Sequence, residues 1–169
     1  MDIEGAILSA IEYENRVYGH YLIASQKLAD PTAERIFGVL ASEERGHIAY
    51  LEDRLKEWQE KGTIDPVILT SILPNSQWLQ EGKVPMKKIS LEKDYENELQ
   101  MLKDALRLER EVSDHYRRLV AALPDPARGM FSRFLEIEEG HTALVQAEID
   151  ALQKDGFWFD ISEFNLEAG

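Results

Sequence analysis

The chain has 169 residues, of which 44% are hydrophobic and 30% charged, a balance typical of a folded globular protein rather than a disordered one. It contains no cysteine, which excludes disulfides, thiolate catalysis, iron–sulfur clusters and cysteine zinc sites within these residues. Acidic residues outnumber basic ones by 32 to 19, and the formal charge of −13 argues against nucleic acid as a partner.

The first half of the chain contains the pattern of two helices. Apolar residues recur at spacings of three, four and seven from Ile7 to Leu28, which predicts an amphipathic helix. Asp30-Pro31 then supplies an N-cap and a proline at the first helical position of a second helix. This second helix is expected to stop near Lys61-Gly62.

Residues 62–89 form a long connection, with a short helix expected near Val67–Ile72. A third helix is expected from near Ser90 to Leu123. The fourth opens at Asp125-Pro126, with the same cap as the second, and ends at Gly156. The aromatic residues that follow, Phe157-Trp158-Phe159, are expected to pack against the helices or against a second subunit.

The spacing of these helices predicts an all-α fold with one domain over residues 1–169. The turns around the two Asp-Pro pairs are only a few residues long, and such short connections force antiparallel hairpins. The long connection can cross the length of a bundle whose helices are roughly 40 Å long. We therefore predict a four-helix bundle of two antiparallel hairpins joined by a long crossover.

The two hairpins repeat each other in sequence at an offset of 94 to 95 residues. Apolar positions recur by helical period alone, but polar residues recurring on apolar faces need another explanation. The matching polar residues are Glu14 and Glu109, His20 and His115, Tyr21 and Tyr116, Glu44 and Glu138, and His47 and His141.

The repeated acids and histidines predict a metal site. Glu44 and His47, like Glu138 and His141, are three residues apart and share a helix face, while one further Glu lies in the apolar seam of each hairpin's first helix. Four bare carboxylates buried together are strongly unfavourable, so cations must neutralise them. Oxygen and imidazole ligands suit iron or manganese.

Two copies of a Glu-x6-Tyr pattern followed by Glu-x-x-His resemble the rubrerythrin and ferritin-like di-iron family, and the resemblance covers residues 7 to 155. The resemblance implies a ferritin-like bundle that binds two iron ions per chain, with manganese as the alternative. It implies that Glu44 and Glu138 bridge the two metals. Glu14 and His47 would then ligate one metal terminally, and Glu109 and His141 the other.

The resemblance implies a di-iron oxidoreductase that reacts with peroxide or oxygen, forms a homodimer and is reduced by an external donor such as a rubredoxin-like protein. Two departures are visible: the chain has no cysteine for a rubredoxin domain, and Val112 stands where rubrerythrins have an additional Glu. Two alternatives stay open at this point. One is a ferroxidase that handles iron, and the other is a non-enzymatic, metal-stabilised helical adaptor.

The tyrosines, histidines and glutamates close in sequence to the predicted ligands are expected to have supporting or surface roles. Tyr21 and Tyr116 either hydrogen-bond a ligand carboxylate or only pack. The repeated His20 and His115 are expected to have packing or polar surface roles, and Glu43, Glu136 and Glu139 are expected on solvated faces. With acids near its N-terminus and no apolar run approaching about 20 residues, the chain is expected to be cytoplasmic and without a membrane span.

Overall fold

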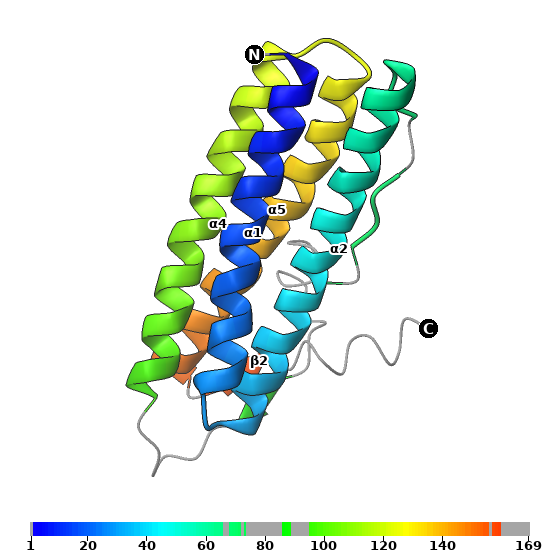
Figure 1. Ribbon diagram of the computed structural model, residues 1–169. Helices are drawn as coiled ribbons and strands as arrows, with labels where there is room; N and C mark the ends of the chain where they lie inside the picture. The colour runs from blue at the N-terminus through cyan, green and yellow to red at the C-terminus, as the bar shows by residue number, and fades with distance from the viewer. Residues whose placement is uncertain are drawn as a thin grey trace.

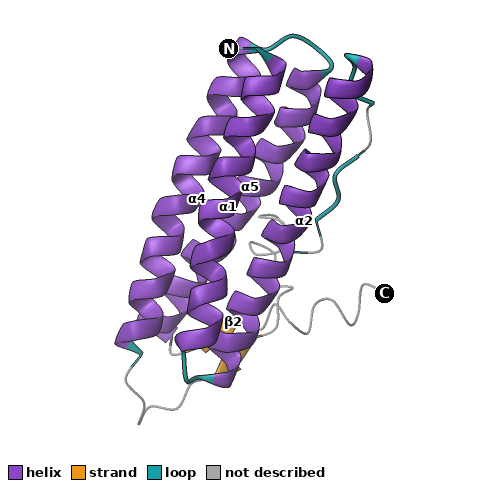
Figure 2. Ribbon diagram, in the orientation of Figure 1, coloured by secondary structure: helices purple, strands orange, loops and turns teal. Residues whose placement is uncertain are grey.

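The computed structural model describes residues 2–65, 68–71, 73, 86–88, 95–155 and 157–159. The fold is an all-α four-helix bundle, as the sequence predicts (Figure 1), and helices dominate the described residues (Figure 2). The helices are α1 (Ile3–Lys27), α2 (Pro31–Lys61), α4 (Glu96–Ala122) and α5 (Ala127–Asp150).

The four helices form two antiparallel hairpins, α1 with α2 and α4 with α5. Each hairpin is closely packed, and α1 also packs along α4, whereas α2 and α5 approach each other less closely among the described residues. The end of α2 and the start of α4 lie at opposite ends of the bundle (Figure 1). The chain between them therefore has to cross the length of the bundle, as predicted.

The ends of α2 follow the sequence signals. The Asp30 carboxylate accepts hydrogen bonds from the backbone N–H groups of Thr32 and Ala33 at 2.9 and 3.1 Å. Gly62 closes the helix with a φ of 67°, a left-handed conformation that favours glycine because it has no Cβ atom. The predicted cap and stop of this helix are both confirmed.

The matching prediction for α5 is wrong. The Asp125–Pro126 peptide bond is cis, the helix begins at Ala127, and Pro126 rather than Asp125 occupies the N-cap position. The Asp125 carboxylate instead pairs with Arg128 at 2.5 Å. The predicted start of the third helix at Ser90 lies outside the described residues, and α4 begins at Glu96.

The segment that follows α2 is not helical at residues 68–71, so the short helix expected there is wrong. The Arg133 Nε atom on α5 donates a hydrogen bond to the Leu69 carbonyl oxygen at 3.0 Å. In a helix this oxygen would instead accept a backbone hydrogen bond from within the helix. This contact fixes the segment beside α5.

The C-terminal aromatic segment packs against the bundle, as one of the two predicted arrangements requires. After α5 comes a π-helical turn, η1 (Ala151–Asp155), and then β2 (Phe157–Phe159), which pairs antiparallel with β1 (Met86–Lys88). Trp158 is only 1% exposed and meets the Tyr95 ring edge-on at 6.3 Å.

Apolar side chains from all four helices fill the interior, with Phe37, Phe131 and Phe134 among the largest that are fully buried. Within the described part of the chain, no helix combines the length and the apolar character that crossing a membrane requires. The interior is interrupted by a group of buried polar residues, which forms the candidate site.

Candidate metal centre

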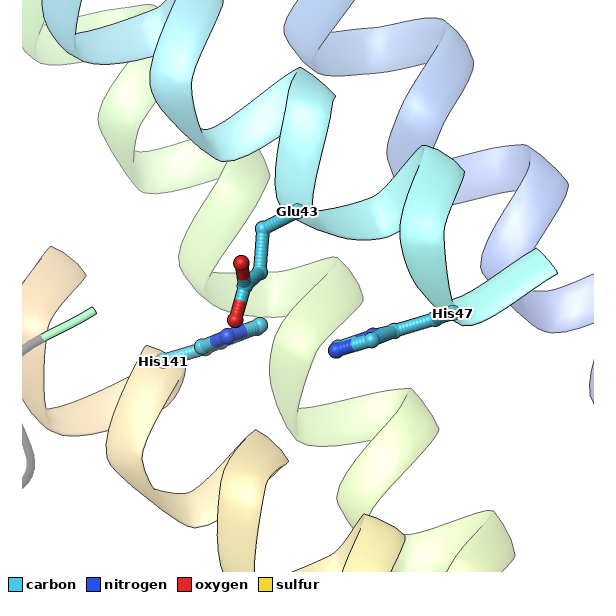
Figure 3. A group of neighbouring side chains, drawn as sticks. All are labelled: Glu43, His47 and His141. Atoms are coloured by element: carbon cyan, nitrogen blue, oxygen red, sulfur yellow. The ribbon is translucent and has the colours of Figure 1, made fainter. Parts of the chain in front are cut away.

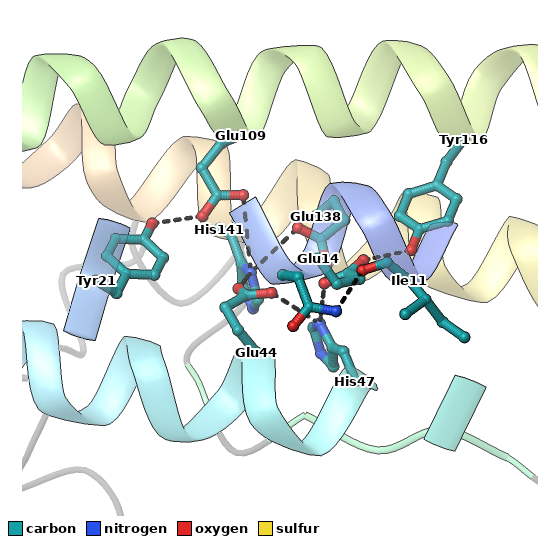
Figure 4. A network of polar contacts seen from close by, with 10 residues as sticks. Ile11, Glu14, Tyr21, Glu44, His47, Glu109, Tyr116, Glu138 and His141 are labelled. Atoms are coloured by element: carbon teal, nitrogen blue, oxygen red, sulfur yellow. Dashed lines mark hydrogen bonds and ion pairs between the residues drawn. The ribbon is translucent and has the colours of Figure 1, made fainter. Parts of the chain in front are cut away.

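The six predicted ligands come from all four helices and meet inside the bundle (Figure 4). None of them is more than 1% exposed. The contributing residues are Glu14 on α1, Glu44 and His47 on α2, Glu109 on α4, and Glu138 and His141 on α5. The predicted convergence of these six side chains is confirmed.

The two histidines lie at the centre of the cluster. The His47 Nδ1 atom lies 3.1 Å from Glu138 Oε1 and 3.3 Å from both Glu14 Oε2 and Glu44 Oε2. The rings of His47 and His141 are stacked, with centroids 5.4 Å apart and planes 6° from parallel. Phe134 covers the edge of the His47 ring at 5.5 Å, so one wall of the site is apolar.

His141 repeats this arrangement in the second hairpin. Its Nδ1 atom lies 3.0 Å from Glu44 Oε1, 3.3 Å from Glu138 Oε2 and 4.0 Å from Glu109 Oε2. Each histidine therefore faces one carboxylate of its own and the same two others. We call Glu44 and Glu138 the shared pair, and Glu14 and Glu109 the terminal pair.

The ligand atoms form two groups that could each hold a metal ion. Within each group the atoms all lie within 4.8 Å of one another. The first group contains Glu14 and His47, the second contains Glu109 and His141, and both contain the shared pair. Two groups of four that share two carboxylates are the arrangement expected for two adjacent cations with bridging ligands.

The carboxylates of the shared pair have unusual surroundings. All four of their oxygen atoms are buried without a well-aligned hydrogen bond among the described residues, and the Nδ1 atoms of the two histidines lie 3.0–3.3 Å from them. Burial of two adjacent carboxylates is costly, because it removes the water that stabilised their charges. Coordination of a cation removes this cost, so the donors present fit a metal pair.

The four buried carboxyl groups have shifted pKa values, in one direction for the terminal pair and in the other for the shared pair. Burial, followed by repulsion from Glu138 and Glu44, raises the pKa of both Glu14 and Glu109 well above its ordinary value of 4.5. Burial also tends to raise the pKa of the shared pair, but the nearby histidines outweigh it and lower both values.

The pKa values of the two histidines are raised, in contrast to those of the shared pair. Burial alone lowers the pKa of His47, but the carboxylates around it, Glu44 first, raise that pKa well above 6.5. The same balance, with Glu138 first, raises the pKa of His141. Binding of cations would therefore compete with protonation of the histidines and of the terminal pair.

Tyr21 and Tyr116 hydrogen-bond two of the candidate ligands rather than only packing. The Tyr21 hydroxyl donates to Glu109, and the Tyr116 hydroxyl donates to Glu14. Both rings are fully buried. Each tyrosine therefore orients the terminal carboxylate of the opposite hairpin.

Glu43 was expected on a solvated face, and that prediction is wrong. It is 7% exposed, and a carboxylate oxygen lies within 4.8 Å of a ring nitrogen of both His47 and His141. Its position four residues before His47 places both side chains on one face of α2, a signal that the sequence already contained. Glu136 and Glu139 are exposed, as expected.

The second repeated histidine pair lies outside the cluster, as expected. His20 Nε2 lies 2.8 Å from the Met101 carbonyl oxygen. His115 stacks on Tyr13 with ring centroids 4.2 Å apart, and its Nε2 atom lies 3.1 Å from the Ser9 hydroxyl. Both histidines therefore have packing and polar roles away from the candidate metals.

Comparison of the chain with protein-family models, with curated proteins and with solved structures found no match. The interpretation of the site therefore rests on its own residues.

Proposed function

We propose that this chain is a rubrerythrin-like member of the ferritin-like di-iron proteins and acts as an oxidoreductase. The observation that carries the proposal is that two buried four-residue ligand groups share Glu44 and Glu138. Glu14 with His47 completes one metal position, and Glu109 with His141 completes the other. Oxygen and imidazole donors suit iron, and manganese is the alternative.

A bound pair of Fe(II) ions supplies two electrons, which with two protons reduce one hydrogen peroxide to two water molecules. The surrounding residues hold this chemistry in place. The tyrosines fix the terminal pair by hydrogen bonds, and burial excludes bulk water from the carboxylates. Val112 is 1% exposed and cannot ligate a metal, so each metal would keep its histidine, His47 or His141, in both oxidation states.

The reduced state has to be restored by an external donor, such as a rubredoxin-like protein. The chain has no cysteine and therefore no thiolate-bound iron to deliver electrons from within. We therefore expect oxidation of the bound iron to stop after one burst unless a donor is present.

The test is to load the protein with two Fe(II) ions without oxygen and then to add peroxide while following absorbance. One equivalent of peroxide should oxidise both ions, and turnover should continue only with a reduced rubredoxin-like donor. Continuous accumulation of iron far beyond two ions per chain would favour a ferroxidase role. Oxidation no faster than in the Glu44→Ala variant would contradict the proposal.

A further inference from the structure

Two cavities reach the histidine side of the cluster near the gap between α2 and α5. One is about 370 Å³ and is lined by α2 and residues 68–70, with Glu43, His47, Tyr50 and Asp53 as its ionisable groups. The other is about 140 Å³ and has His141 in its wall. Two further cavities in the described part of the molecule are lined by none of the six ligands.

The larger of these two cavities runs from exposed residues to one of the six proposed ligands, His47. Asp53 and Thr70 in its wall are exposed, whereas Glu43 and His47 are buried. A small solute that enters beside Asp53 therefore meets Glu43 and His47 at the inner end. Among the described residues that line this cavity, Glu43 alone contributes a carboxylate at the inner end.

Glu43 lies directly beside the stacked histidines (Figure 3). Its carboxylate is close to the His141 ring, with the His47 ring opposite. The Nδ1 atoms of the histidines face the cluster of carboxylates, while their Nε2 atoms are buried and lack a hydrogen-bond partner within the described ranges. One ligand atom each of Glu43, His47 and His141 lies within 4.8 Å of the others, so these three residues could contact one cation on its way inward.

We infer that Glu43, with His47 and His141, forms a transit site through which divalent cations from solvent reach the metal centre. The inference rests on the proposed function, since it requires a metal centre as the destination. The carboxylate and imidazole donors suit the same metals as the centre itself. The net charge of −13 raises the local concentration of cations, and Glu43 directs them into this cavity.

The internal repeat separates this role from that of a resident ligand. Each of the six ligands has a counterpart in the other hairpin, but the position that matches Glu43 is Ile137. A resident ligand of a two-fold site should occur twice, whereas a route needs to be open on one side only. Removal of the Glu43 charge should therefore slow loading and leave the final metal content unchanged.

The experiment measures the rate of Co(II) uptake by metal-free protein, from stopped-flow absorbance. Glu43→Gln should load about tenfold more slowly than the wild type and still bind two Co(II) ions, since loss of electrostatic guidance lowers association rates by this order. Glu139→Gln is the matched control. Glu139 follows the ligand Glu138, pairs with Arg117 at 2.7 Å and lines a different cavity, so its removal should not change the rate.

A second variant tests the route without removing a charge. Gly46 lines the same cavity, and a Cβ atom placed there meets no other atom within 4 Å. Gly46→Leu should narrow the cavity and slow Co(II) uptake. Gly19→Leu is its control, because Gly19 has equal space on α1 but lines none of the cavities described above.

The possible results separate this inference from the proposed function. Uptake by Glu43→Gln at the wild-type rate, or a final content below two Co(II) ions, would overturn the transit site. If Glu43→Gln fails to fold, uptake by Gly46→Leu at the rate of Gly19→Leu would overturn it. A wild-type protein that binds no Co(II) would contradict the metal centre itself.

Discussion

Tyr21 hydrogen-bonds Glu109 on the opposite hairpin, although Glu14 lies seven residues before it on its own helix. Tyr116 and Glu14 form the reciprocal pair. This exchange ties α1 to α4 through the site and makes the position of each terminal carboxylate depend on both hairpins. The ligand geometry is therefore a property of the assembled bundle and not of either hairpin alone.

Replacement of Tyr21 by Phe should weaken one of the two metal positions. The hydroxyl orients Glu109 and favours its ionised form, so its loss raises the pKa of that carboxyl further. The metal held by Glu109 and His141 should bind about 10- to 100-fold more weakly, the usual effect of losing such a partner. Metal titration checks this, with Tyr18→Phe, a half-buried tyrosine on the same helix, as control. Equal affinity in both variants would contradict the role of Tyr21.

The two Asp-Pro turns should respond differently to mutation. Asp30→Ala removes an N-cap that accepts two backbone hydrogen bonds and should lower the free energy of unfolding by about 1 kcal/mol. Asp125→Ala removes an exposed ion pair with Arg128 and a single weak backbone hydrogen bond from Gly129, and should cost less. Urea denaturation of both variants gives the comparison. Equal losses would show that the Asp125 carboxylate caps its helix as strongly as Asp30 does.

The sequence predicted the four-helix bundle and its six central polar residues because both depend on helical periodicity and on an internal repeat. The cap at Asp125 was wrong because the motif does not specify how the chain enters the turn. The i, i+4 spacing of Glu43 and His47 places both on one face of α2, but the approach of Glu43 to His141 depends on how α2 and α5 pack, which the sequence of α2 alone does not specify. The partner of Tyr21 likewise depends on how the hairpins dock, which neither hairpin's sequence specifies alone.

The metal-free protein should lose stability as the pH rises above 4.5. Carboxylates raise the pKa of both His47 and His141 above 6.5 in the folded state. Their contribution to stability is therefore fully present below pH 6.5 and is lost as the pH rises through the folded-state pKa. The terminal pair acts in the same direction, because its raised pKa values mean that the folded protein binds more protons above pH 4.5.

In acid, the shared pair makes the stability of the folded protein fall as the pH falls. Its lowered pKa values contribute stability that is present above pH 4.5 and is lost as the pH falls through the folded-state pKa. The metal-free protein should therefore be most stable near pH 4.5 and should lose stability above it, first through the terminal pair and then through the histidines. Urea denaturation at several pH values on both sides of this maximum tests the prediction. Equal stability at pH 6 and pH 9 would contradict a buried, mutually repelling cluster.

Metal binding should release protons. Four groups have raised pKa values in the metal-free site, namely the two histidines and the terminal pair. All four must lose their protons to become ligands, so affinity should increase with pH. Calorimetric titration with a divalent metal in buffers of different ionisation enthalpy measures this release. A binding enthalpy that does not depend on the buffer would contradict the assigned protonation.

The number of metal ions bound per chain tests the metal centre most directly. Native mass spectrometry of the reconstituted protein should show two ions on the wild-type chain. Glu14→Ala should retain one tightly bound ion, because it removes a ligand from one position only. Glu44→Ala should lose both, because Glu44 belongs to both ligand groups. Two tightly bound ions on Glu44→Ala, or none on the wild type, would contradict a shared-carboxylate metal pair.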